Sequence, residues 1–308
     1  QVMHMLTVMI VGLAMGATVT IGRAVGAENK LRAARLIGNT VTLFMAGSVV
    51  LAAVLVGLVD PIVRIVSTPE QAVAGTRTYL IICFIGVPCI TAYNIMASIF
   101  RGLGDSRSPM YFIAVACAIN IILDYLFIGG LHMGAAGAAL GTTCSQTISV
   151  LIALVVIMKK KTGISLSKND FKIDRKTIKR LLKIGIPVAL QDGFIQIAFI
   201  IITIIANRRG LTDAAAVGIV EKVISFLFLV PSSMLSTVSA LGAQNVGAGK
   251  PERASATLKY AICIAGGFGL IIAIIIQFTA GNVVNLFTND QAVVYAGAKY
   301  LKGYIWDC

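Results

Sequence analysis

The sequence predicts an all-α integral membrane protein, and three observations support this fold class. Of the 308 residues, 57% are hydrophobic and only 13% are charged, whereas soluble domains carry about 25% charged residues. Apolar stretches recur along the whole chain at the length of about 20 residues that a bilayer-spanning helix needs. The basic residues are unequally divided between the segments that connect these stretches. A large soluble core would not explain this regular recurrence.

The apolar stretches predict eight spans and a ninth that is cut off, so we expect a polytopic chain. The first stretch is not a signal peptide, because it lacks a basic start and many spans follow it. Pro88, Pro187 and Pro231 fall in or near spans, where a proline can kink a helix. The predicted spans are 2–22, 37–59, 78–100, 109–129, 133–158, 183–206, 213–241, 256–280 and 292–307.

The net charge of +13 could indicate nucleic-acid binding, but its distribution favours a membrane. If the segment after the first span is cytoplasmic and the segments alternate, 19 of the 26 basic residues lie inside and 6 lie outside. This bias follows the positive-inside rule. The basic stretch 159–183 is expected to face the cytosol and anionic lipid headgroups. We therefore predict a multi-pass protein of the cell membrane, with membrane lipids and no nucleic acid among its partners.

The cysteines and histidines indicate no metal site. The six cysteines form no CxxC pair, and all but Cys308 lie in apolar spans, as small buried hydrophobes do. His4 and His132 are far apart, and neither has ligand-like neighbours. We expect neither a metal nor a cofactor.

Two pairs of segments indicate an internal repeat. VGAENKLRA (25–33) resembles VGAGKPERA (246–254) at a distance of 221 residues, and TPEQAV (68–73) resembles TNDQAV (288–293) at 220. Many transporter folds are built from such repeats. Both VGA segments are basic and fall on the inner side of the charge pattern, so the repeat unit contains an even number of helices, about six. The two copies are then related by an axis along the membrane normal.

The repeat also predicts how the chain is organised. We expect an N-terminal helical bundle over 1–158, a cytoplasmic linker over 159–182 and a C-terminal bundle over 183–308. The counterpart of the span at 183–206 would precede residue 1, and the counterpart of 88–158 would follow residue 308. The expected parent therefore has twelve helices, of which about nine are present.

Four segments resemble one known family. They are FRGLGDSRSPM (100–110), NIILDYLFI (120–128), GAAGAALGT (134–142) and VPSSMLSTVSALGAQNVGAGKPERA (230–254). With the duplicated twelve-helix plan, they resemble the multidrug and toxic compound extrusion (MATE) family of the MOP superfamily. The resemblance implies a MATE-like two-bundle fold of two six-helix repeats around a central cavity.

The same resemblance implies multidrug efflux by cation-coupled antiport and alternating access. Small amphipathic or cationic drugs would leave the cell in exchange for H⁺ or Na⁺, and we expect a monomer. No Walker motif is visible, so an ion gradient and not ATP is the expected energy source.

Asp124 is the first candidate for the coupling residue. A charge at the bilayer centre costs at least about 2.5–3.5 kcal/mol on insertion scales, so such residues usually face protein or water. Asn120 lies four residues before Asp124, so both share one helical face. Desolvation favours the neutral form of a carboxylate, which lets it bind a proton or pair with a cation. The alternative is that Asp124 only ties helices together by hydrogen bonds.

The family resemblance extends this candidate site to the next helix. In related exporters an ion or proton site uses the Asn-xxx-Asp turn and a threonine of the following helix, which match Asn120, Asp124 and Thr142. The family also uses an acid on its first helix, which the repeat places before residue 1. Gln146, one turn after Thr142, is a candidate for lining the same pocket or for a helix-to-helix hydrogen bond.

Two further acids are candidates for a substrate cavity. Glu221 lies beside Lys222, and the pair either faces a drug cavity or snorkels near a helix end. Asp192 follows Pro187 and lies near Gln191 and Gln196. Some family members carry an acid on this helix, although not at a clearly matching register.

Three other functions fit the sequence less well than export does. A lipid-linked oligosaccharide or polysaccharide flippase of the same superfamily would line its cavity with several basic residues, whereas Lys222 is the one basic residue that lies away from the ends of the eight full predicted spans. A membrane-embedded enzyme would need catalytic residues at a suitable spacing, and we identify none. A channel would show a repeated pore loop, which is not apparent. Separately, GAAGAALG (134–141) predicts a small-residue helix face that allows close backbone approach.

Overall fold

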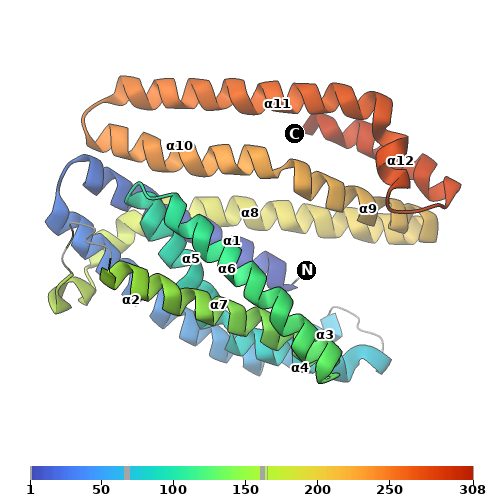
Figure 1. The fold of residues 1–308 in the computed structure, drawn as a ribbon, viewed down its shortest axis with the longest axis horizontal. Coiled ribbons are helices and arrows are strands. Elements are labelled where there is room, and N and C mark those ends of the chain that lie inside the picture. Colours follow the sequence, from blue (N-terminus) through green and yellow to red (C-terminus); the bar gives the residue numbers. More distant parts are fainter. Residues whose placement is uncertain (1, 66–69, 160–163, 165, 308) are drawn as a thin grey trace. The chain divides into compact units, whose positions relative to one another are not determined.

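The computed structural model describes residues 2–65, 70–159, 164 and 166–307, and every regular element within them is a helix. Figure 1 shows this arrangement. The elements are α1 (Val2–Gly26), α2 (Lys30–Gly57), α3 (Val59–Ile65), α4 (Glu70–Ile85), α5 (Val87–Gly102), α6 (Arg107–Asp124), the π-helix η1 (Tyr125–Gly130), α7 (Gly134–Lys159), the 3₁₀-helix η2 (Lys168–Phe171), α8 (Arg175–Arg209), α9 (Leu211–Leu227), α10 (Leu229–Gly247), α11 (Pro251–Asn285), α12 (Gln291–Tyr304) and the 3₁₀-helix η3 (Ile305–Asp307).

Within the described residues, seven helical segments are long and apolar enough to cross a membrane, and a bent pair counted as one span makes eight, in agreement with the eight full spans predicted. Seven are continuous or nearly so, and the eighth is a pair of helices, 73–85 and 87–102, that bend by 47° at Gly86. The ninth prediction corresponds to α12, whose 14 residues are fewer than the about 17 that a span requires. The all-α membrane fold class is confirmed.

Two of the three prolines coincide with breaks in the helices. Pro88 lies in the first turn of α5, directly after the bend at Gly86. Pro231 lies in the first turn of α10, after the break at Phe228. In contrast, Pro187 lies inside α8, which continues to Arg209. A proline at the first turn of a helix needs no N–H partner, which explains the preference for the two boundaries.

The chain divides into two compact units, residues 1–190 and 191–308, with the division inside α8. In the first unit, α1 packs against α5 and α2, and α7 packs against α6, α4 and α5. Its largest core cluster joins Ile21, Leu36, Phe100, Phe112 and Leu181. Phe100 and Phe112 meet edge to face, with ring centroids 5.3 Å apart, a favourable aromatic geometry.

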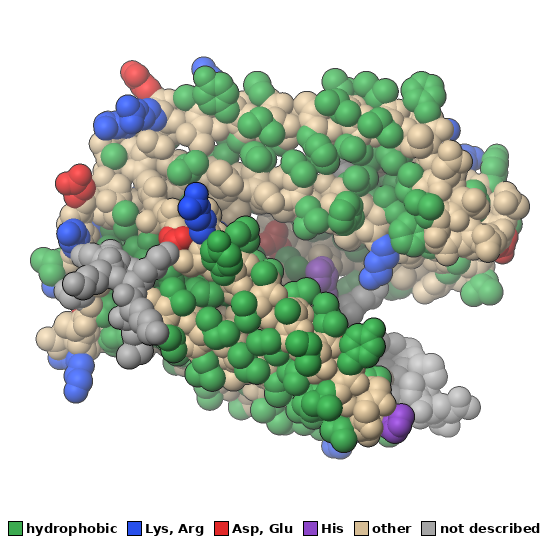
Figure 2. Space-filling view, viewed as in Figure 1, with side chains coloured by type: hydrophobic (Ala, Val, Ile, Leu, Met, Phe, Trp, Pro, Cys, Tyr) green, Lys and Arg blue, Asp and Glu red, His purple; other side chains and the backbone are tan. Residues whose placement is uncertain are grey.

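The second unit has a core of its own. In it α10 runs beside α11 (Figure 1), α11 contacts α12, and α12 contacts α9. Val220, Ile224, Val284 and Leu301 are almost fully buried there. In both units many large apolar side chains remain exposed. Figure 2 shows them along the visible faces of the long helices, with charged side chains mostly near helix ends, as lipid-facing helices require.

Part of the predicted linker is held against α2. Residues 160–163 and 165 lie outside the described residues, but η2 and the chain after it are described. Asn39, which is 2% exposed, donates hydrogen bonds to the carbonyl oxygens of Asp170 and Lys172, both at 3.1 Å. Its side-chain oxygen accepts from the Asp174 N–H at 2.7 Å. Gly38 leaves room for this contact, because a Cβ there would collide with the Asp170 backbone.

Asp174 begins α8 by accepting hydrogen bonds from the residues after it. The Thr177 hydroxyl donates to its carboxylate at 2.6 Å, and the Lys176 N–H donates at 3.1 Å. These bonds, led by that of Thr177, hold the pKa of the Asp174 carboxyl below its usual range.

The first pair of repeat segments forms the same backbone turn twice. After α1, the N–H groups of Ala27, Glu28 and Asn29 donate to the carbonyl oxygens of residues 23, 25 and 24. After α10, the N–H groups of residues 248, 249 and 250 donate to those of 244, 246 and 245. Every donor and acceptor is displaced by 221 residues, which supports the repeat. In the second pair of segments, residues 68 and 69 lie outside the described residues.

The two turns differ in the residue that adopts a positive φ. Glu28 has φ 55° and its counterpart Gly249 has φ 70°. A left-handed conformation costs an L-residue about 1–2 kcal/mol, whereas glycine adopts it freely but loses roughly 0.5–1 kcal/mol more entropy on folding. We therefore expect Glu28→Gly to leave the thermal midpoint in detergent unchanged or higher, and Gly249→Ala to lower it. The opposite order of the two midpoints would contradict this account of the turn.

Candidate ion and substrate sites

The end of α6 carries the Asn120–Asp124 pair. Both side chains are half-buried, whereas Ile121, Ile122 and Tyr125 between and beside them are exposed. Asp124 is the last α-helical residue, and the π-helix η1 begins at the next position. A π-helix within a helical segment often marks a functional site. This π-helix was not predicted from the sequence.

The pair faces α7 at Gly141. A Cβ atom at Gly141 would collide with Asp124 Oδ1 and would lie 3.5 Å from Asn120 Nδ2. One turn earlier, a Cβ at Gly137 would lie 3.1 Å from the backbone of Phe127. The small residues of 134–141 thus allow the close approach that the sequence predicted, and Gly141 is a residue of the site that the sequence analysis did not single out.

Several buried polar atoms around this region have no hydrogen-bond partner among the described residues. Asp124 Oδ1, Asn120 Nδ2 and Gln146 Oε1 belong to this group, as do the hydroxyls of Thr91 and Thr143. An unsatisfied buried polar group costs about 1–3 kcal/mol, so most such groups in proteins are paired. Three of the five are side chains proposed from sequence. A bound proton or cation would satisfy the Asp124 and Gln146 oxygens, and a water would also accept from the Asn120 Nδ2 donor.

Thr142 follows Gly141 but is directed along its own helix. Its hydroxyl donates to the Ala138 carbonyl oxygen at 3.0 Å. No hydrogen bond joins it to Asp124 within the described part of the chain. The structure therefore brings Asn120 and Asp124 together at Gly141, with Thr142 adjacent in the chain and Gln146 one turn further along α7.

The acids of the second unit have different surroundings. Thr203 Oγ1 of α8 lies 3.1 Å from Glu221 Oε1 of α9 and 2.9 Å from the Phe199 carbonyl oxygen, so its one proton is shared. Lys222 is exposed, since adjacent helical residues do not face each other. Asp192 is half-buried on α8. Among the described residues, no hydrogen bond joins Asp192 to Glu221.

A cavity of about 580 Å³ also lies in the second unit. Arg209 and Asp213 form an ion pair of 2.9 Å at its wall, and Lys299, Tyr295 and Tyr300 line it as well. This cavity was not predicted from the sequence. The spacing of Arg209 and Asp213 by four residues was the available signal, but it does not reveal the tyrosines of α12.

Comparison with known proteins decides the family. The MatE family model matches residues 1–126 and 187–308, one segment in each half of the chain. The chain belongs to the MatE family. Members of this family are membrane transporters and not enzymes, which excludes the membrane-enzyme alternative. Together with the eight candidate spans, membership makes the chain a multi-pass protein of the plasma membrane.

Two curated MatE relatives come from Bacillus subtilis (strain 168). The probable multidrug resistance protein YoeA is 27% identical over 96% of this chain and 65% of its own length. The probable multidrug resistance protein YpnP is 30% identical over 80% of this chain and 55% of its own length. The chain thus spans less than two thirds of the length of these relatives.

A solved structure confirms the MatE fold. The outward-facing conformation of a multidrug resistance MATE family transporter of the MOP superfamily has a TM-score of 0.87 and 24% identity. The similarity covers 98% of this chain and 68% of that one.

Gly141 offers a test of the site geometry. We expect Gly141→Ala to push Asp124 and Asn120 away from α7, because the added methyl group collides with the carboxylate. Overpacking of this kind costs about 1–3 kcal/mol, and roughly 1.4 kcal/mol corresponds to tenfold weaker binding. In a transport assay, the ion concentration for half-maximal export should rise on the order of tenfold. Gly75→Ala, which meets nothing within 4 Å, is the control. Equal values for both variants would contradict the geometry.

Proposed function

We propose that the protein exports amphipathic or cationic drugs by antiport with H⁺ or Na⁺, through alternating access. The observation that supports this proposal most directly is the Asn120–Asp124 pair. The pair is held against α7, and its buried polar atoms lack hydrogen-bond partners among the described residues. A carboxylate beside a neutral amide oxygen can hold a proton or a small hard cation, which prefers oxygen ligands.

Loading and release of the ion would bias the two orientations of the transporter. A ligand shifts a conformational equilibrium only as far as it binds one state more tightly than the other. In the ion-free form, Asp124 is a charge among apolar helices, which favours an orientation that exposes it to water. With the ion bound, that charge is compensated, so the opposite orientation becomes accessible.

Two observations support drugs as the substrates: the names of the relatives and the acids of the second unit. The curated relatives are named for multidrug resistance, which does not favour the flippase alternative. Asp192 and Glu221 are half-buried acids that would attract cationic substrates, and Gln146 would contribute a neutral polar contact in the first unit. We propose that the transporter works as a monomer.

The test is drug export from proteoliposomes under one gradient at a time. Purified protein is reconstituted, a fluorescent cationic dye such as ethidium is loaded, and either a proton gradient or a sodium gradient is imposed. We expect one of the two gradients to drive export and the other to fail. Export that ignores both gradients, or that requires ATP, would refute ion-coupled antiport.

A further inference from the structure

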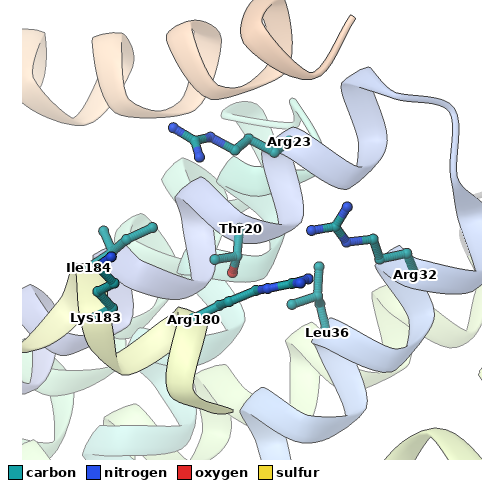
Figure 3. Close-up of a pocket in the computed structure, with 7 residues that line it drawn as sticks. All are labelled: Thr20, Arg23, Arg32, Leu36, Arg180, Lys183 and Ile184. Carbon is teal, nitrogen blue, oxygen red and sulfur yellow. The ribbon is translucent and has the colours of Figure 1, made fainter. Parts of the chain in front are cut away.

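A basic pocket in the first unit has no role in the proposed export cycle. It has a volume of about 330 Å³ and is lined by residues of α1, α2 and α8. Figure 3 shows Arg32 and Arg180 extending toward each other from α2 and α8, with Thr20 of α1 behind them. The lining residues are Thr20, Arg23, Arg32, Leu36, Arg180, Lys183 and Ile184.

The charges of this pocket are not balanced by any ion pair among the described residues. Four of its lining side chains are basic and none is acidic. Among the described residues, the ion pairs join Arg77 to Asp60 and Arg209 to Asp213, and neither pair involves the pocket. Like charges that converge repel one another, and an anion between them removes the repulsion. Guanidinium groups bind phosphate oxygens with two parallel hydrogen bonds, so the pocket matches a phosphate group.

An apolar groove continues from the pocket along α8. It is lined by Ile178, Leu182, Ile186 and Pro187, with Arg175 and Lys179, and it shares Lys183 with the pocket. Ile178, Leu182 and Ile186 are spaced by four residues, so they form one stripe of the helix. Ile186 is 44% exposed. A soluble anion would use the basic pocket and leave this stripe uncovered, whereas a phospholipid would cover both.

We propose that the pocket binds the headgroup phosphate of an anionic phospholipid, whose acyl chain lies along the α8 groove. Arg180 and Lys183 of the pocket belong to the basic stretch 159–183, and Arg23 and Arg32 lie in the segment after the first span. The charge pattern assigns both segments to the cytoplasmic side, where the anionic lipids of the inner leaflet lie. Basic pockets between transmembrane helices on that side bind such headgroups. The lipid would join α1 and α2 to the start of α8, and this role is independent of which substrate is exported.

The test measures binding of dioctanoyl phosphatidylglycerol to the purified protein in a neutral detergent, by native mass spectrometry. Dioctanoyl phosphatidylcholine and inorganic phosphate serve as comparison ligands. We expect phosphatidylglycerol to bind most tightly, and the double variant Arg32→Gln/Arg180→Gln to weaken its binding at least tenfold. The matched control is Lys176→Gln/Arg253→Gln. It removes the same charge from positions outside the pocket, and Arg253 is the repeat counterpart of Arg32. We expect less than a twofold change in this control.

Three results would overturn the proposal. If phosphatidylglycerol binding weakened equally in both double variants, the lipid would be attracted by the basic surface in general and not by this pocket. Equal binding of phosphatidylcholine would remove the requirement for a net negative headgroup. Inorganic phosphate that binds as tightly as phosphatidylglycerol would make the ligand a soluble anion.

Ile186→Ser keeps the test decisive if the arginine variant does not fold. This substitution leaves every charge in place and removes apolar contact from the groove. We expect it to weaken phosphatidylglycerol binding severalfold without changing the weak binding of inorganic phosphate. Unchanged lipid binding in this variant would contradict the placement of the acyl chain.

Discussion

Asp124→Asn is expected to reduce ion-driven export to the level of empty proteoliposomes. Asparagine has nearly the shape of aspartate and still forms hydrogen bonds, but it carries no charge and does not take up a proton. The variant therefore separates the two roles considered for this residue. If Asp124 only ties helices together, asparagine preserves export, whereas ion coupling requires the carboxylate itself.

The stability of this variant is part of the same experiment. A buried charge without a partner is costly, so its removal should leave the thermal midpoint in detergent unchanged or raise it. Glu252→Gln removes an exposed acid at the start of α11 and serves as the matched control with full export. Wild-type export by Asp124→Asn would exclude Asp124 as the coupling residue, even though its side chain faces α7.

Gly16→Ala is expected to destabilise the first unit strongly. A Cβ at Gly16 would collide with the Leu181 carbonyl oxygen of α8 and would lie 2.9 Å from the Gly185 nitrogen. Reciprocally, a Cβ at Gly185 would lie 2.5 Å from the Leu13 carbonyl oxygen of α1. The obstacles are backbone atoms on both sides, so no side-chain rotation relieves the clash.

The expected cost is at or above the upper end of the usual range for overpacking, about 3 kcal/mol. This cost is measured as a lower midpoint of thermal unfolding, with size-exclusion chromatography of the heated protein as the readout. Gly47→Ala in α2 is the control, because a Cβ there meets nothing within 4 Å and alanine favours a helix by about 0.5–1 kcal/mol. A midpoint for Gly16→Ala equal to that of Gly47→Ala would show that α1 and α8 do not cross closely at these glycines.

The spans could be predicted from sequence because hydropathy alone determines them. Backbone groups in lipid must bond internally, so each long apolar stretch has to be a helix. The pairing of Asn120 with Asp124 follows from helical spacing in the same way. The bend at Gly86 and the break at Phe228 were marked by Pro88 and Pro231, but Pro187 has the same local signal and lies inside an intact helix.

The parts of the candidate site that sequence could not supply depend on tertiary contacts. That Gly141, among the small residues of 134–141, lies opposite Asp124 is a property of how α6 and α7 pack. The π-helix after Asp124 has no composition that distinguishes it from an α-helix. The basic pocket combines side chains from positions 23, 32 and 180, and their distance along the chain conceals the cluster.

The hydrogen bonds that Asn39 forms have a consequence for limited proteolysis. The segment 168–176 is rich in lysine and lies at the surface, which by composition makes it a preferred substrate for trypsin. A protease, however, must draw several residues into its cleft in an extended form, and here the peptide groups of 170, 172 and 174 are already fastened to a helix. Trypsin can therefore cleave this segment only after the segment has detached from α2. The cleavage rate then measures how often the segment detaches.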